Sequence, residues 1–324
     1  MANVYAIVFE ITVFCGFEVN LRRLEFTLTT KCNSQCIHCQ ADASPLKNEV
    51  MDVKSAHNYL AEAATVSHLE SFMVFGGEPM LFPERTIAIF EKAHQLGIPR
   101  IEMITNGVWG KNKEEAREWA EKLKAAGLNN VDISVDAFHA QYTPIEYPQN
   151  AALALVKAEV EVIKWNVAVI ESIEAENMYD KKTRQILKKL EPLGLEANFV
   201  KIMPVGRAAK NLREYFQHAS LDGPCEGEPL IGNKLTNPDS ICIEPSSSVD
   251  ICFHLAIGNA KEAPLSRIIS EYDWQKYPVI RTLVQEGSTA LLRLPQVHGY
   301  KFQENDYINK CHLCTEIRKV LKLS

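Results

Sequence analysis

The chain has 324 residues, 46% of them hydrophobic and 23% charged, with a formal net charge of −6. This length holds one large core or two domains. The acidic balance and the absence of a Lys/Arg stripe argue against nucleic acid or a membrane surface as a partner. Residues 1–22 begin with an apolar stretch that includes Glu10 and Glu18 and lacks a basic start. They are expected to form an extra strand, not a signal peptide or a membrane span.

From residue 23 onward, short β-rich segments alternate with amphipathic helical segments. The expected strands are 24–30, 69–75, 101–105, 131–136, 165–172 and 195–203. The expected helices between them are 55–66, 84–97, 113–126, 152–160 and 181–194. Six such units with short connections predict an α/β fold, a partial (β/α)6 TIM-like barrel over residues 23–220. Ligands of such folds bind at the carboxyl ends of the strands.

The pattern changes near residue 221, where Gly, Pro, Asn and Ser become more frequent. Two short strands, 240–245 and 248–252, are joined by a Ser-rich turn. A second, smaller domain is therefore expected over residues 221–324, ending in a helix at 316–324.

The nine cysteines are an odd number and gather at positions 32–39, 225–252 and 311–314. Such clusters in a cytosolic protein indicate metal binding rather than disulfides, and we expect the reducing cytoplasm as the compartment. Cys15 lies outside the clusters and is expected to be a buried apolar residue.

The first cluster is Cys32, Cys36 and Cys39, spaced C-x3-C-x2-C directly after the first strand. A structural zinc site needs four ligands, and His38 is poorly placed to be the fourth because it adjoins Cys39. A [4Fe–4S] cluster held by three thiolates explains the missing ligand, since one iron stays open to an outside ligand.

Three further motifs follow the next strands in order: GGEP at 76–79, TNG at 105–107 and SVD at 134–136. With the cysteine triplet they resemble the radical S-adenosylmethionine (SAM) superfamily over about residues 24–210. The resemblance implies that the open iron binds SAM. It also implies that the cluster, reduced by a partner such as flavodoxin or ferredoxin, passes an electron to SAM. This cleaves SAM to methionine and a 5′-deoxyadenosyl radical, which abstracts a hydrogen atom from the substrate.

The resemblance also implies a set of cofactor contacts. Glu78 and nearby carbonyls would hold the methionyl ammonium, Ser134 and Asp136 the ribose, and Arg207 the SAM carboxylate. The full set is His38, Gly76, Gly77, Glu78, Pro79, Asn106, Ser134, Asp136 and Arg207. His38 departs from the aromatic residue that family members often carry there, but its backbone would still flank the adenine. Taken singly, these motifs could instead be a tight turn, a strand-to-helix turn and a helix cap.

The second cysteine set contains Cys225, Cys242, Cys252 and the CxxC pair Cys311 and Cys314. Zinc is the general interpretation of such a set. After a radical SAM domain, the layout resembles the Twitch form of the SPASM extension, which implies an auxiliary [4Fe–4S] cluster on Cys225, Cys252, Cys311 and Cys314. Cys242 is then a core thiol, a ligand in place of Cys225, or a catalytic hydrogen-atom donor.

Relatives with such extensions mostly modify peptides or proteins, so we expect a peptide or protein substrate and a crosslinking, epimerisation or oxidation reaction. A dehydrogenase or lyase acting on a small molecule is the alternative. A non-enzymatic iron–sulfur or zinc module is the second alternative. His139 and Tyr142 either line the substrate pocket or serve only in packing.

Overall fold

The structure is a computed structural model that describes residues 20–321 except 228, 231 and 298. Cys15 and almost all of the predicted N-terminal strand lie outside these residues.

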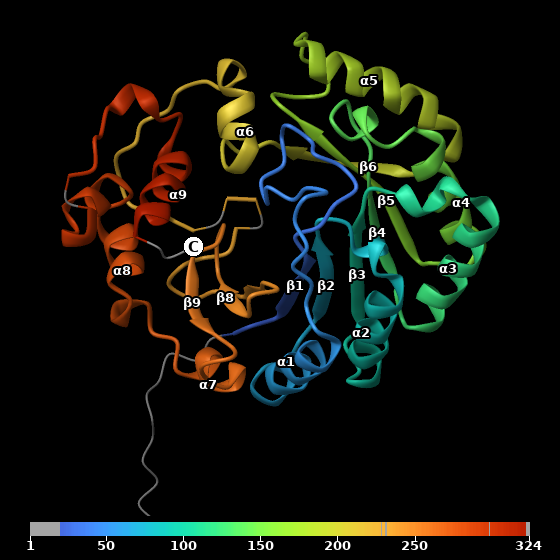
Figure 1. Ribbon diagram of the computed structural model, residues 1–324, viewed down its shortest axis with the longest axis horizontal. Helices are drawn as coiled ribbons and strands as arrows, with labels where there is room; N and C mark the ends of the chain where they lie inside the picture. Colours follow the sequence, from blue (N-terminus) through green and yellow to red (C-terminus); the bar gives the residue numbers. More distant parts are fainter. Residues whose placement is uncertain (1–19, 228, 231, 298, 322–324) are drawn as a thin grey trace, which may run out of the picture.

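Six parallel strands form one side of a single sheet, each hydrogen-bonded to the next. They are β1 (Arg23–Thr29), β2 (Ser71–Gly76), β3 (Arg100–Thr105), β4 (Asn130–Ser134), β5 (Val162–Val169) and β6 (Glu196–Lys201). The helices between them are α1 (Val53–Val66), α2 (Pro83–Gln95), α3 (Lys113–Ala125), α4 (Glu146–Lys157) and α5 (Met178–Leu190). These helices run along the outside of the curved sheet (Figure 1). The predicted α/β fold, an open barrel-like sheet that is mostly parallel, is confirmed.

Packing between strands and outer helices explains the apolar sequence of the strands. The Phe26 and Phe72 rings on β1 and β2 meet edge to face at 4.9 Å, and Phe72 meets Phe90 of α2 at 6.3 Å. All three side chains are fully buried. In β2 (SFMVFG), where the first four residues are buried, burial on both faces accounts for the hydrophobic run.

The C-terminal segment extends the same sheet from its β1 edge. Strand β7 (Ser240–Ile243) pairs parallel with β1, and β8 (Ser248–Asp250) and β9 (Ala256–Asn259) follow antiparallel. The remaining helices are α6 (Gly206–Asn211), α7 (Leu265–Ser270), α8 (Pro278–Gln285) and α9 (Lys310–Val320). The boundary proposed at residue 220 stays a prediction, since the sheet continues across it.

Helix α9 begins six residues before the predicted helix at 316–324, so Cys311 and Cys314 lie on the helix itself. Strand β9 and helices α6, α7 and α8 were not predicted. Within the described residues, every helix is too short or too polar to cross a membrane.

Candidate functional site

A cavity of about 260 Å³ lies at the carboxyl ends of the parallel strands. Cys32, Cys36 and Cys39 all line it, from the loop that follows β1. The other predicted residues that line it are His38, Gly76, Gly77, Asn106, Ser134, Asp136 and Arg207. Glu78 and Pro79 are buried and are not among its lining residues. Sequence positions as far apart as 32 and 207 thus meet where the fold predicts a ligand site.

The two glycines of GGEP pack against the start of the cysteine loop. The Gly77 amide donates to the Thr29 carbonyl at 2.6 Å, and the Glu78 amide donates to the Lys31 carbonyl at 2.9 Å. A Cβ atom on Gly77 would lie 1.9 Å from the Lys31 carbonyl oxygen. Only glycine permits this approach, so the motif fixes where the loop leaves β1.

Glu78 joins the ends of β2 and β3. Its carboxylate accepts hydrogen bonds from the Thr105 hydroxyl at 2.7 Å, the Asn106 amide at 2.7 Å and the Met80 amide at 3.0 Å. Burial raises the pKa of Glu78, while these hydrogen bonds lower it. Its predicted contact with the methionyl ammonium stays a prediction, because its oxygens already have partners in the protein.

Asn106 links Glu78 to the cysteine loop through hydrogen bonds. Its side-chain nitrogen donates to the Asn33 side-chain oxygen at 2.8 Å and to Cys32 Sγ at 3.7 Å. Hydrogen bonds to ligand sulfurs tune the metal centre that those sulfurs hold.

Arg207, from α6, holds the other end of the loop. Its guanidinium donates to the Cys36 carbonyl at 2.9 Å and the Ala43 carbonyl at 2.7 Å, and it pairs with Asp42 at 2.8 Å. Gly206 brings the helix this close, since a Cβ there would lie 2.3 Å from the Gln40 carbonyl oxygen. Arg207 therefore anchors the loop, and its predicted contact with the SAM carboxylate stays a prediction.

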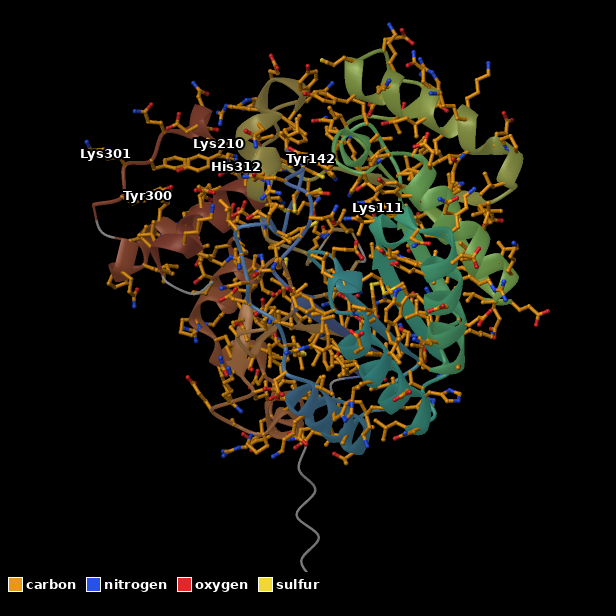
Figure 2. All side chains as sticks on the ribbon, turned by 45° about the vertical axis from the view of Figure 1, so that its right-hand side comes forward. Lys111, Tyr142, Lys210, Tyr300, Lys301 and His312 are labelled. Carbon is orange, nitrogen blue, oxygen red and sulfur yellow. The ribbon has the colours of Figure 1, made fainter. Side chains whose placement is uncertain are left out.

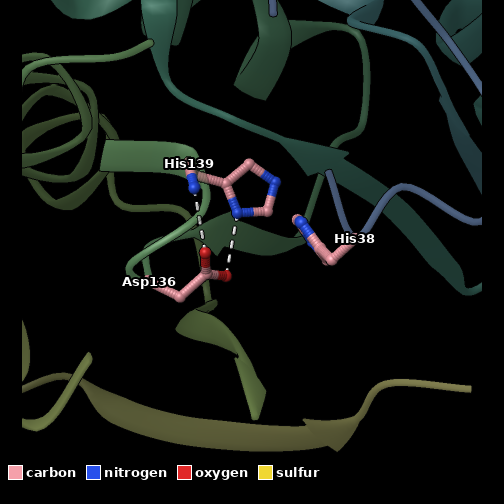
Figure 3. A group of neighbouring side chains, drawn as sticks. All are labelled: His38, Asp136 and His139. Carbon is pink, nitrogen blue, oxygen red and sulfur yellow. Dashed lines mark hydrogen bonds and ion pairs between the residues drawn. The ribbon is translucent and has the colours of Figure 1, made fainter. Parts of the chain in front are cut away.

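Asp136, His139 and His38 form a compact group at the cavity wall (Figure 3). His139 Nδ1 lies 2.8 Å from Asp136 Oδ2, and the other Asp136 oxygen accepts from the His139 amide at 2.9 Å. Burial opposes the charge on both groups. Their attraction and hydrogen bonds nevertheless raise the pKa of His139 and hold the pKa of Asp136 well below its usual range. The predicted ribose contact of Asp136 stays a prediction.

One buried polar atom at this cavity, Nδ1 of His38, lacks a partner among the described residues. Ser134, which is also buried, lines the same cavity. Burial lowers the pKa of His38 to about 3, so its ring is neutral. Buried polar atoms are normally hydrogen-bonded, so this His38 nitrogen suits a polar ligand such as a nucleoside.

Two cysteine thiols of the loop, Cys32 and Cys36, are protonated when no metal is bound. Burial raises the pKa of Cys32 to about 11 and that of Cys36 further above its usual value. Binding iron therefore displaces protons from a loop that the protein already holds in place. Three convergent thiols on a fixed loop fit a cluster with three protein ligands.

A second cysteine site lies in the C-terminal segment. Cys225, Cys252, Cys311 and Cys314 line one cavity of about 280 Å³, and no described cysteine forms a disulfide. Cys242 does not line this cavity. Its sulfur lies 3.5 Å from the Thr27 hydroxyl, at the wall of a third cavity of about 230 Å³.

The third cavity is lined by residues that sequence reasoning missed. They are Glu25, Thr27, Glu244, Asp250 and His254. Nδ1 of His254 lies 3.7 Å from a carboxylate oxygen of both Glu244 and Asp250. A sequence signal existed for Glu25, because a charged residue inside an apolar strand usually has a partner or a function. None existed for the other four. Pairing of β7 with β8 brings Glu244, Asp250 and His254 together, and pairing of β7 with β1 sets them beside Thr27.

A wide surface cleft of about 960 Å³ opens beside these cavities. Tyr142 and Lys210, both labelled in Figure 2, line it together with Arg207, Glu244 and Asp250. The Tyr142 hydroxyl donates to the Gln35 carbonyl at 2.9 Å. The pocket role predicted for Tyr142 stays a prediction.

Part of the parallel sheet, from β1 into β5, matches a known protein family. Residues 26–168 match the sequence model of the radical SAM superfamily. This part of the chain is a radical SAM domain. The match runs from β1 through the cysteine loop, GGEP, TNG and SVD into β5. A radical SAM domain implies a [4Fe–4S] cluster and SAM, and its enzymes use a substrate and a reductant.

Curated relatives correct one prediction. A probable GTP 3′,8-cyclase of Methanocaldococcus jannaschii is 30% identical over 39% of this chain and 40% of its own. A GTP 3′,8-cyclase of Listeria welshimeri is 29% identical over 67% of this chain and 64% of its own. This chain thus spans less than two thirds of these relatives. They are named for a reaction of GTP, a small molecule, so the prediction of a peptide or protein substrate is wrong.

Solved structures support the fold. The structure of anSMEcpe with bound AdoMet superposes with a TM-score of 0.50 at 15% identity, covering 94% of this chain and 98% of that one. At this identity the likeness concerns the fold alone.

Proposed function

We propose that this chain is a radical SAM enzyme that removes a hydrogen atom from a small molecule. The observation that supports this is a row of three adjoining cavities. The cavity of the cysteine loop shares Gln40, Ala41 and Phe75 with the carboxylate-lined cavity. That cavity in turn shares Cys252 and Phe253 with the four-cysteine cavity. A molecule in the middle cavity would lie between the two cysteine sites.

At one end of the row, Cys32, Cys36 and Cys39 would hold the [4Fe–4S] cluster. When bound, this cluster and SAM supply the 5′-deoxyadenosyl radical. His38 Nδ1 has no partner among the described residues and would be available to SAM, and Ser134 lines the same cavity. Glu78, Asn106 and Arg207 would position the loop, because their polar side-chain atoms already bind the protein.

The middle cavity favours a small substrate rich in hydroxyl or amino groups. Its volume of about 230 Å³ equals that of about eight water molecules at their volume in the liquid. Glu25, Glu244 and Asp250 line it with carboxylate groups. Glu25 pairs with Arg23 and the other two pair with His254, and each carboxylate can accept a further hydrogen bond. Among its described lining residues none is Lys or Arg. A triphosphate would lack a counter-ion there, so we do not transfer GTP from the relatives to this chain.

At the other end, we propose that Cys225, Cys252, Cys311 and Cys314 hold an auxiliary [4Fe–4S] cluster in a SPASM- or Twitch-like segment over residues 221–324. Four cysteines on one cavity supply a complete ligand set. Cys242 would then face the substrate as a hydrogen-atom donor, and burial keeps it a neutral thiol by raising its pKa. A flavodoxin or ferredoxin would serve as reductant in the cytoplasm, where free thiols persist.

The test is an anaerobic assay with SAM and dithionite that measures 5′-deoxyadenosine. A panel would contain an aminocyclitol, a neutral monosaccharide, GTP and a mixed tryptic peptide pool. We expect a hydroxyl- or amine-bearing compound to stimulate 5′-deoxyadenosine formation and, when deuterated, to pass deuterium into it. Stimulation by the peptide pool alone would contradict the proposal.

The zinc-module alternative is tested by metal analysis of anaerobically purified protein. About eight irons per chain fit two clusters and about four fit one. Zinc in place of iron would overturn the enzyme proposal.

A further inference from the structure

Arg318 is a buried cation with unused hydrogen-bond donors. It lies on α9, and only 2% of its surface is exposed. One terminal nitrogen donates to the Phe253 carbonyl at 2.7 Å. Nε and the other terminal nitrogen, Nη1, are buried and have no partner among the described residues. Burying a charged guanidinium with unsatisfied donors lowers the stability of the folded protein unless an anion lies beside it.

The surroundings of Arg318 indicate where that anion lies. Arg318 lines the cavity of Cys225, Cys252, Cys311 and Cys314. It also lines the wide cleft that holds Glu244 and Asp250, yet the described residues show no ion pair between Arg318 and either carboxylate. Four thiolates around a [4Fe–4S]²⁺ core would carry a net charge of 2−, which supplies the missing partner.

We propose that Arg318 is the counter-ion of the auxiliary cluster and that it raises the reduction potential of that cluster. Its two unpartnered nitrogens donate to the sulfurs of the cluster, and its charge favours the reduced, more negative state. Hydrogen bonds to cluster sulfurs and the local charge are among the factors that set such potentials. The inference rests on the auxiliary cluster of the proposed function.

The experiment is an anaerobic redox titration of the full-length holoprotein, followed by EPR, in wild type, Arg318→Gln and Arg318→Lys. In Arg318→Gln we expect reduction of the auxiliary cluster to become at least about tenfold less favourable, which is about 59 mV for a one-electron couple. Arg318→Lys should shift the reduction potential of the auxiliary cluster less, because the positive charge is kept. The potential of the SAM-site cluster should stay unchanged in both variants.

Lys310→Gln is the matched control. Lys310 lines the same cavity and carries the same charge, but it is half-buried and donates to the Pro224 carbonyl at 3.1 Å. Water screens its charge, so the shift should be smaller than in Arg318→Gln.

Iron counts separate the possible failures. About eight irons in Arg318→Gln with an unchanged auxiliary potential would overturn the role of Arg318. About four irons in wild type would overturn the auxiliary cluster itself. If Arg318→Gln loses the auxiliary irons while Arg318→Lys keeps them, the counter-ion role is supported. The reduction potential of the auxiliary cluster is then compared between wild type and Arg318→Lys.

Discussion

Glu78 illustrates how single residues prepare the cysteine loop. Its buried carboxylate accepts hydrogen bonds from Thr105, Asn106 and Met80. Asn106 then donates to Cys32 and Asn33. The sequence motif predicted that Glu78 lies near the site. The motif did not predict that the Glu78 oxygens bind groups of the protein itself. Those hydrogen bonds depend on how close the ends of β2 and β3 lie, and a local sequence pattern does not contain that distance.

Replacing Glu78 by Gln should weaken this connection. The amide nitrogen of Gln donates, so at least one of the three donors loses its acceptor at a cost of about 1–3 kcal/mol. We expect the free energy of unfolding to fall by that amount in an anaerobic denaturant titration. Glu118→Gln, an exposed change on α3, should stay within about 0.5 kcal/mol of wild type. Equal stabilities of the two variants would contradict the connection.

The His139–Asp136 pair predicts a pH dependence. The pKa of His139 is raised in the folded state by Asp136. Its contribution to stability is therefore full below the unfolded pKa of histidine and is lost as pH rises through the raised value. The stability difference between wild type and His139→Gln should be larger at about pH 6 than at about pH 9. A difference that does not change with pH would exclude a charged His139.

At the scale of elements, α6 and the GGEP turn hold the cysteine loop from opposite ends. Arg207 and Gly206 bind the segment after Cys36, while Gly77 binds the segment before Cys32. The loop can therefore be ordered before iron arrives. Preorganised ligands bind a metal centre without a large ordering cost.

Arg207→Lys should release the loop at the α6 end. A single ammonium cannot make the contacts that Arg207 makes with Cys36, Ala43 and Asp42. We expect loss of up to about four irons per chain, from the SAM-site cluster only, in anaerobic iron analysis. Lys210→Gln, an exposed change on the same helix, should keep wild-type iron. Full iron in Arg207→Lys would show that the loop does not depend on this anchor.

Some secondary-structure elements could be predicted from the sequence and others could not. Each parallel strand lies within a few residues of its predicted range, because strand and helix periodicities alternate clearly from residue 23 to 203. Strand β9 and helices α6, α7 and α8 were missed, since each has at most eight residues and too few turns to show a period. The cysteine spacing predicted which cysteines line each of two cavities, and their role as ligands stays a prediction. The carboxylate cavity was not predicted, because Glu25 and Thr27 reach it only through the pairing of β7 with β1.

For the whole molecule, the continuous sheet sets the two cysteine sites on either side of one small cavity. The order β6-β5-β4-β3-β2-β1-β7-β8-β9 places the C-terminal hairpin beside the first strand of the barrel (Figure 1). This order is the reason that Glu25 and Thr27 of β1 line a cavity with Glu244 and Asp250.

Because the two cysteine sites are separate, damage to one should leave the reaction at the other intact. Cys314→Ala should keep cleavage of SAM within a few-fold of wild type but form no product from the substrate identified in the panel, because only the distant site is damaged. Cleavage is followed as 5′-deoxyadenosine and product by mass spectrometry. Complete loss of cleavage in Cys314→Ala, with the SAM-site irons retained, would contradict this division.

The most direct test of the central claim is the EPR spectrum of the dithionite-reduced protein before and after SAM is added. If Cys32, Cys36 and Cys39 hold a cluster with one open iron, SAM should change one signal in wild type. The same change should appear in Cys314→Ala, and the responsive signal should be missing in Cys36→Ala. A spectrum with intact cluster signals that SAM leaves unchanged would contradict the claim.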